Sequence, residues 1–288
     1  MYTQRELGKR FKRGFLLSTL LLSGCSNLFS GVASQLADGL SESILSSSDI
    51  ETVREGVPAF LLLIDGLLKS GAETTELLVS AADLNGSFSV LVEDKDRLKM
   101  LSAKAMRYSD QAACVSSSKL CGARQLAFSE YETVVASLSS KDLLVAYSLG
   151  TSWVGRLQAN SDDWAVISEL NRAKLLMEKV VELDETYQNG RAHLYLGGIE
   201  TLLPKLMGGR PEKGKKHFER AIEIEERFLL SKVIYAEQYA RLVFDQQLHD
   251  RLLEEVLAAD PIAGEFTLTN QIAKKRAIIL LEGSKDYF

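Results

Sequence analysis

Three segments in the second half of the chain share one pattern, and this repetition constrains the fold most strongly. In each segment a large apolar residue is followed three positions later by a smaller one, and an acidic residue or a proline ends the segment. Residues three apart lie on one face of an α-helix, so each segment predicts the end of an amphipathic helix. The segments are Met177-Glu-Lys-Val180-Val-Glu-Leu-Asp-Glu185, Phe218-Glu-Arg-Ala221-Ile-Glu-Ile-Glu-Glu226 and Leu253-Glu-Glu-Val256-Leu-Ala-Ala-Asp-Pro261.

Two further segments complete the pattern of a helical hairpin. Leu149-Gly150 is followed by Trp153, and Leu196-Gly197 comes directly after Tyr195. A glycine beside a large apolar residue lets two helices approach closely, as in the first helix of a tetratricopeptide (TPR) repeat of about 34 residues. The spacing here is longer than in a regular repeat. The sequence therefore predicts an all-α fold, an irregular TPR-like array of antiparallel helical hairpins.

Composition agrees with helices throughout, because proline occurs only four times and Leu, Ala, Glu and Lys are abundant. A helix is predicted over 50–69, with Pro58 in its first turn. The run 59–64 is apolar on all sides, so we expect this helix to be buried between others. A further helix is predicted over 73–83, ending near the turn signal Asn85-Gly86.

The start of the chain has the pattern of a bacterial lipoprotein signal. Basic residues precede an apolar run from Phe15 to Leu22, which is shorter than the roughly 20 residues of a membrane-spanning helix. Ser23, Gly24 and Cys25 follow, and this order matches a lipobox, in which the cysteine thiol is alkylated by a diacylglycerol before cleavage. The alternative is an ordinary buried cysteine after a soluble helix. The basic residues are Arg5, Lys9, Arg10, Lys12 and Arg13.

This leader implies a division of the chain into a signal peptide over 1–24, a lipid-anchored segment over 25–50 and a helical domain over 51–288. The protein is then expected on the periplasmic side of a membrane. Ser26, rather than Asp, after the lipidated cysteine favours the outer membrane in bacteria that follow that rule.

Two cysteines, Cys114 and Cys121, lie within a weaker hairpin predicted over 96–138. In an exported protein such a close pair favours a disulfide that closes a short loop, and three serines between the cysteines allow the closure. Two separate thiols at helix ends are the alternative. No CxxC spacing supports metal or redox chemistry.

The remaining sequence excludes several function classes. The formal net charge is −5 and the leader is basic, so the rest of the chain is more acidic still, which argues against nonspecific nucleic-acid binding. The three histidines, His193, His217 and His249, have no metal-binding spacing. There is no phosphate loop, nucleophile elbow or dinucleotide fingerprint. We therefore expect no enzyme activity, no metal and no cofactor.

Two features are candidates for binding. Tyr235 and Tyr239 are four residues apart and share a helix face, where they either pack the core, the favoured alternative, or contact a ligand or partner helix. The densest cluster of helix-breaking residues includes Gly208, Gly209 and Pro211. It predicts a rigid exposed turn between two helices.

Beyond these patterns, most of the chain after the leader resembles the TatT proteins, which are TPR-containing lipoproteins associated with TRAP (tripartite ATP-independent periplasmic) transporters. The resemblance is strongest from 190 to 281 and is weakest over 107–135. The segments that carry it are 53–65, 192–204, 208–212, 217–221, 232–241, 244–245, 248–261 and 268–270.

The resemblance implies a periplasmic accessory subunit that binds the solute-binding protein of a TRAP transporter and shelters or relays a hydrophobic or organic-acid ligand. It also implies homo-oligomerisation, as a trimer. A TPR array alone says only that something is bound. The alternative function is a TPR scaffold lipoprotein for envelope or outer-membrane protein assembly.

Overall fold

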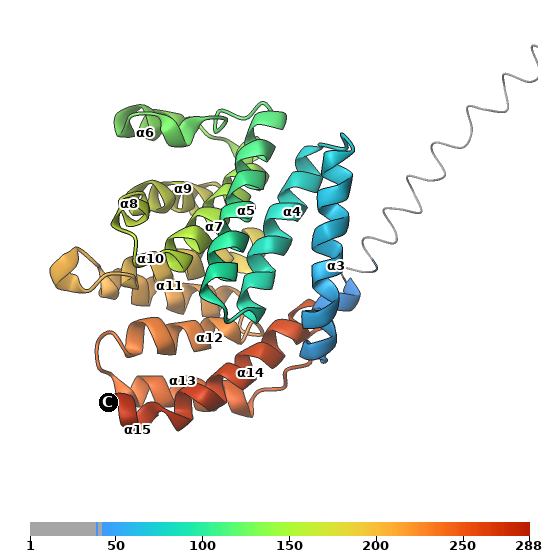
Figure 1. The fold of residues 1–288 in the computed structure, drawn as a ribbon. Helices are drawn as coiled ribbons and strands as arrows, with labels where there is room; N and C mark the ends of the chain where they lie inside the picture. The colour runs from blue at the N-terminus through green and yellow to red at the C-terminus, as the bar shows by residue number, and fades with distance from the viewer. Residues whose placement is uncertain (1–38, 40–41) are drawn as a thin grey trace, which may run out of the picture.

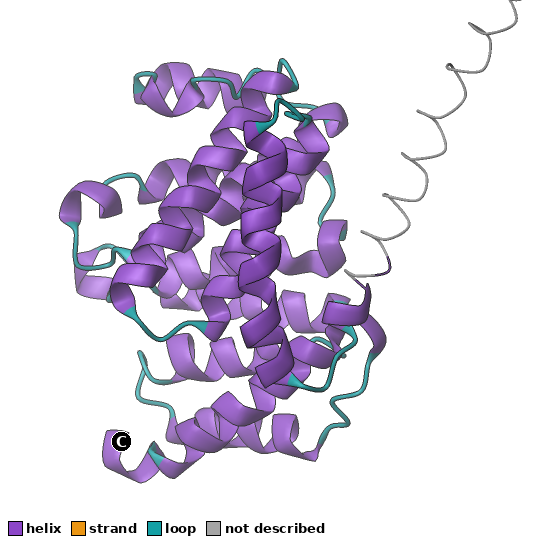
Figure 2. Ribbon diagram, turned by 45° about the vertical axis from the view of Figure 1, so that its right-hand side comes forward, coloured by secondary structure: helices purple, strands orange, loops and turns teal. Residues whose placement is uncertain are grey.

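The computed structural model describes residue 39 and residues 42–288, so the predicted signal peptide and Cys25 lie outside the described residues. The described part is helical and contains no strand, which confirms the all-α prediction (Figure 2). Its principal helices are α3 (Ile50–Lys69), α4 (Thr75–Phe88), α5 (Lys95–Val115), α6 (Phe128–Ala136), α7 (Leu143–Ala159), α8 (Trp164–Ile167), α9 (Leu170–Leu183), α10 (Arg191–Thr201), α11 (Pro211–Ile224), α12 (Leu230–Ile234), the π-helix η6 (Tyr235–Ala240), α13 (Gln246–Ala258), α14 (Thr267–Glu282) and α15 (Ser284–Tyr287).

Most helices pack against the helices before and after them in the chain, although α6 packs against α9 (Figure 1). A second set of contacts joins alternate helices. Thus α4 contacts α7, α7 contacts α10, α10 contacts η6, and α12 contacts α14. These five elements (α4, α7, α10, α12–η6 and α14) form what we call the inner layer, and α5, α9, α11 and α13 pack against it from outside. The arrangement is compatible with a TPR-like array of hairpins.

Close contacts between a glycine and a large side chain hold two of the hairpins together. A Cβ on Gly150 of α7 would lie 2.3 Å from Sδ of Met177 on α9, and a Cβ on Gly197 of α10 would lie 2.6 Å from the Phe218 ring on α11. Met177 and Phe218 are the first residues of two repeated sequence segments. The prediction that the Leu-Gly pairs allow close helix packing is therefore confirmed.

The C-terminal helix returns to the start of the array. In Figure 1, α14 reaches the lower end of α3, and the two helices are in contact. Leu268 of α14 packs in one apolar cluster with Ile50 and Val53 of α3, and Lys275 Nζ lies 3.3 Å from Oε1 of Glu51. The long helices near the two ends of the described domain, α3 and α14, are thus joined.

The helix predicted over 50–69 is α3 (Ile50–Lys69), and its start is fixed by the Asp49 carboxylate, which accepts hydrogen bonds from the N–H groups of Glu51 and Thr52, both at 3.1 Å. Pro58 lies inside α3. Its predicted place in the first turn is therefore wrong, and so is the predicted end of the next helix. Helix α4 continues through Asn85 to Phe88, since the buried Asn85 side chain donates to a carbonyl of its own helix instead of forming a turn.

The expectation that α3 is buried on all sides is also wrong. Leu61 is 7% exposed, whereas Leu62 and Leu63 are 73% and 57% exposed, and Leu67 is exposed as well. Only one face of α3 packs, against α4 and α14, because α3 lies at the edge of the array (Figure 1). Leu62, Leu63 and Leu67 form an exposed apolar stripe, which we call the α3 stripe.

Candidate functional site

Polar and aromatic side chains from three helices of the inner layer converge. Asp83 comes from α4, Tyr147 from α7, and Arg191 and Tyr195 from α10. The rings of Tyr147 and Tyr195 are 6.4 Å apart, and the Ser148 hydroxyl donates to Oδ1 of Asp83 at 3.4 Å. We call Asp83, Tyr147, Arg191 and Tyr195 the inner polar cluster.

Asp83 is exposed to solvent and yet strongly desolvated by surrounding protein. Burial raises the pKa of its carboxyl to about 6, while the Ser148 hydroxyl and the positive charge of Arg191 act in the opposite direction. The inner polar cluster therefore contains a solvent-accessible carboxyl whose charged form the surrounding protein disfavours.

Arg191 stands at the start of α10 with its guanidinium over two aromatic rings. The guanidinium carbon lies 4.7 Å from the centre of the Phe228 ring and 5.8 Å from that of Phe266. Its Nε is buried and has no hydrogen-bond partner among the described residues. Burial raises the pKa values of the nearby Tyr147 and Tyr195 phenols, and the charge of Arg191 opposes both shifts.

One helical turn beyond Tyr195, Gly198 continues the same face of α10. A Cβ at Gly198 would lie 3.0 Å from Oε1 of Gln238 on η6 and 3.5 Å from Nε2 of Gln158 on α7. Oε1 of Gln238 is buried without a hydrogen-bond partner within the described chain. Two amide groups therefore extend the polar surface from the inner polar cluster along α10.

Sequence reasoning missed the inner polar cluster. The available signal was the spacing of Arg191, Tyr195 and Gly198, which places them on one face of a helix. That spacing could not reveal Asp83 and Tyr147, because they are distant in the sequence and only the packing of α4 and α7 beside α10 brings them near.

Tyr235 and Tyr239 lie elsewhere, in the π-helix η6, and the two residues are 3% and 5% exposed. The Tyr235 ring stacks on Phe218 at 5.3 Å, and its hydroxyl donates to Glu219 at 3.3 Å. The Tyr239 hydroxyl donates to Glu212 at 3.5 Å. This burial agrees with the core-packing alternative.

Two of the three histidines come together between α10 and α11. The Nδ1 atoms of His193 and His217 are 2.9 Å apart, so one ring donates and the other accepts. His249 is separate and contacts Asp250 at 2.8 Å. In the part of the chain that the structure describes, no group of three or more His, Cys, Asp or Glu side chains could hold a metal ion.

The turn with Gly208, Gly209 and Pro211 connects α10 to α11. Gly208 has a φ of +94°, and a Cβ on Gly209 would collide with the carbonyl of Leu203, so both positions require glycine. Pro211 begins α11, as the sequence predicts. The apolar side chain at the tip of this turn, Leu206, is fully exposed.

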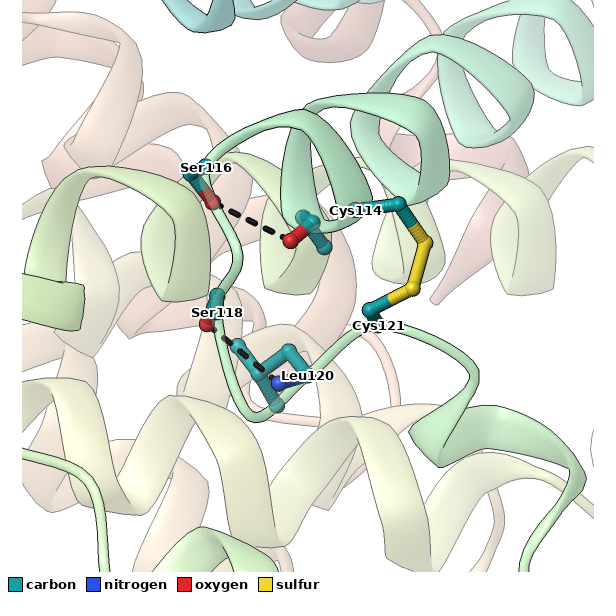
Figure 3. The surroundings of a disulfide bond; sticks show 6 residues. Cys114, Ser116, Ser118, Leu120 and Cys121 are labelled. Carbon is teal, nitrogen blue, oxygen red and sulfur yellow. Dashed lines mark hydrogen bonds between the residues drawn. A yellow bond between two sulfur atoms is a disulfide. The ribbon is translucent and has the colours of Figure 1, made fainter.

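A disulfide joins Cys114, near the end of α5, to Cys121 in the loop before α6, with a Cα–Cα distance of 4.4 Å (Figure 3). Serines order this loop. Ser116 Oγ donates to the carbonyl of Ala113 at 3.1 Å, and Ser118 Oγ accepts from the Leu120 N–H at 3.3 Å. Because the disulfide lies apart from the inner polar cluster in the sequence and fold, we assign it a structural role only.

A layered array of helical hairpins of this kind is typical of proteins that bind or scaffold other molecules. The family model of the TRAP transporter T-component (TAtT) matches residues 46–288. The chain therefore belongs to the TRAP transporter T-component family and has an accessory role in TRAP transport. Comparison with curated proteins finds no match. No helix within residues 42–288 has both the length and the apolar character needed to cross a membrane.

Proposed function

We propose that this protein binds the periplasmic solute-binding protein of a TRAP transporter and shelters or relays an organic ligand. The observation that carries the proposal is the family match over residues 46–288, which covers the whole helical array. The inner polar cluster supports the ligand part, because Arg191 Nε and, further along α10, Gln238 Oε1 have no hydrogen-bond partner among the described residues.

The N-terminal sequence supports the location of this activity. A lipid on Cys25 would hold the helical domain on the periplasmic side of a membrane, with Ser26 favouring the outer membrane. A tethered domain meets only partners that enter the periplasm, and a solute-binding protein is such a partner. The domain division at 1–24, 25–50 and 51–288 belongs to the same proposal.

The α3 stripe supports self-association, which we propose as a homotrimer. Contiguous apolar side chains on the surface of a folded domain are typical of interaction sites. Leu62, Leu63 and Leu67 lie along one helix at the edge of the array, where a second copy could cover them.

Capture from living cells tests the proposed partner. The tagged full-length protein is cross-linked at its natural level, purified from membranes and analysed by mass spectrometry, with another outer-membrane lipoprotein as control. Specific recovery of a TRAP solute-binding protein supports the proposal. Recovery of an outer-membrane barrel-assembly component, without the solute-binding protein, would instead support the envelope-assembly alternative.

A further inference from the structure

We propose that the turn over 202–210, which we call the α10–α11 turn, docks on an anionic lipid bilayer. Leu206 and Met207 insert among the lipids, and basic residues around them contact the headgroups. The inference goes beyond the binding of a receptor or a ligand. It uses the proposed lipid on Cys25 and assigns the end of the helical array that faces the membrane.

The first argument is that the α10–α11 turn holds an apolar tip out of the fold. Leu206 is fully exposed and Met207 is half exposed. The N–H groups of Met207 and Gly209 donate to the carbonyl of Pro204 at 2.9 and 3.1 Å. These hydrogen bonds close the turn, and nothing in the described domain covers Leu206 at its tip.

The second argument is that a buried ion pair fixes the turn to the array. Oε1 of Glu200 lies 2.5 Å from Nζ of Lys174, and Oε2 of Glu200 lies 3.2 Å from Nε of Arg210. The N–H of Arg210 also donates to the carbonyl of Glu200 at 2.8 Å. Lys174 and Glu200 are buried, so the apolar tip stands on an ordered base. A tip that is ordered in advance loses little conformational freedom on docking.

The third argument is the positive charge around the tip. Lys205 lies beside Leu206, Arg210 and Lys213 follow at the start of α11, and all three are exposed. Neither lysine has a carboxylate at ion-pairing distance within residues 42–288. Glu212 is the one acid over 203–216, although the whole chain has a net charge of −5. A basic, apolar tip on an acidic protein complements an anionic lipid surface.

Neighbouring hairpins present similar side chains at the same end of the array. The connections from α7 to α9, from α10 to α11 and from η6 to α13 lie at the left of Figure 1. They carry the exposed residues Trp164, Leu206 and Phe244. In the connections at the other end, over 184–190, 225–229 and 259–266, Ile262 is the one exposed large apolar residue. Apolar and aromatic side chains of this kind anchor proteins at a bilayer surface.

A bilayer fits this end better than a protein partner does. The exposed apolar residues stand on separate turns rather than in one contiguous patch (Figure 1). The acids beside Trp164 are already bonded, because Asp162 pairs with Lys99 at 3.2 Å and Asp163 accepts from the N–H of Ala165 at 2.9 Å. Positive charge therefore dominates at the exposed tips.

The proposed anchor allows this orientation. A lipid on Cys25 would keep the domain beside a bilayer. The residues between Cys25 and the described domain can span at most about 60 Å when extended. The tether therefore does not force α3, where it enters the domain, against the bilayer.

Lipid contact is measured on the full-length lipidated protein in vesicles of phosphatidylethanolamine and phosphatidylglycerol. A fluorophore is attached at Leu206→Cys, since the lipid occupies Cys25 and the disulfide occupies Cys114 and Cys121. Lipids with brominated acyl chains quench a label only where they contact it. We expect quenching at Leu206→Cys and little at Ile262→Cys. Ile262 is the matched control, because it is an exposed apolar residue at the other end of the array.

Lys205→Gln combined with Lys213→Gln tests the role of charge. A basic residue near an anionic surface contributes about 1 kcal/mol, so the double variant should lower the ratio of inserted to withdrawn label by about 10–30-fold. Vesicles of phosphatidylcholine alone should also lower it. Both lysines are exposed, so the helical circular dichroism should be unchanged.

Absence of quenching at Leu206→Cys, or equal quenching at Leu206→Cys and Ile262→Cys, would overturn the inference. Quenching that neither phosphatidylcholine nor the double variant reduces would overturn it as well. If the label at Leu206→Cys is shielded only after the solute-binding protein is added, the turn docks on protein instead. Mass spectrometry of Cys25 tests the anchor, and capture of the solute-binding protein tests the proposed partner. Failure of either is therefore distinct from failure of bilayer docking.

Discussion

The aromatic ring of Phe218 lies against Gly197 so closely that a Cβ on Gly197 would come within 2.6 Å of it. Gly150 and Met177 repeat the relationship one hairpin earlier, at 2.3 Å. Protein interiors are close-packed, so a single added methyl group has no free space at such a contact. The two contacts set the distance between the paired helices of each hairpin, α7 with α9 and α10 with α11.

Gly197→Ala should destabilise the fold by about 1–3 kcal/mol, the usual cost of overpacking a core, despite the better helix propensity of alanine. Urea unfolding followed by circular dichroism measures the change. Gly155→Ala is the matched control, since it is also a helix-interior glycine but has no heavy atom within 4 Å of the added Cβ. The control should be neutral or stabilising by up to about 1 kcal/mol. Equal effects of the two substitutions would contradict the packing argument.

The histidine pair should make stability depend on pH. Burial lowers the pKa of His193, and burial together with the nearby His193 lowers the pKa of His217 to about 4. The unfolded chain, with histidine pKa values near 6.5, then binds more protons than the folded one. The contribution of the neutral histidine pair to the free energy of unfolding is therefore complete above about pH 6.5, and it is lost as the pH falls toward 4. The charged groups that face the pair are Glu185 and Arg220 at His193, and Glu200, Lys174 and Lys213 at His217.

Urea unfolding between pH 4 and pH 7.5 measures this dependence. His217 should account for roughly 2–3 kcal/mol of the loss, because each pKa unit corresponds to about 1.4 kcal/mol and some of the effect is screened. His217→Gln, which cannot be protonated, should remove that part of the slope. A slope that is the same in His217→Gln and in the unaltered protein would show that the pair does not control acid stability.

Asp83 should destabilise the fold at neutral pH. Burial raises its folded pKa to about 6, above the unfolded value of 3.8. Its contribution to stability is thus complete below pH 3.8 and is lost as the pH rises through 6. Asp83→Asn should therefore be more stable than the unaltered protein at pH 7.5, with no gain below pH 4. Arg191 is the charged group that faces it. Thermal unfolding at both pH values measures the difference, and Asp162→Asn, at an exposed carboxylate whose pKa is lowered by Lys99, should show no such gain.

The α3 stripe should control self-association. Leu62→Lys with Leu63→Lys places two charges on the exposed face of α3 without touching the buried Leu61, so the fold should persist and the oligomer should dissociate. Light scattering after size-exclusion chromatography gives the molecular mass. Ile279→Lys is the control, because Ile279 is a similarly exposed apolar residue on α14. If the double variant keeps the mass of the unaltered oligomer, the stripe is not the interface.

The sequence predicted the repeating parts of the fold and missed the parts that depend on long-range packing. The repeated segments at Met177 and Phe218 and the Leu-Gly pairs were sufficient for the hairpins, because each carries its own helical period. The end of α4 was missed because a buried Asn85 bonds to its own helix, which a turn propensity does not anticipate. The exposure of Leu62 was missed because an apolar run does not show how many other helices will pack around it.

The candidate site was the least predictable part. The sequence indicated Tyr235 and Tyr239 as candidate binding residues. Both are buried residues of η6, and the Tyr235 ring stacks on Phe218. Asp83 and Arg191 are ordinary charged residues in their local sequence, and they stand out only when α4 and α10 are seen to share the inner layer. The pairing of His193 with His217 likewise depends on the packing of α10 against α11.

The most direct test of the accessory function is a binding titration between the purified protein and the purified solute-binding protein of a TRAP transporter from the same cell, followed by biolayer interferometry. We predict saturable binding that an unrelated periplasmic binding protein does not show. Absence of binding to the TRAP solute-binding protein, in the presence and absence of its solute, would contradict the account.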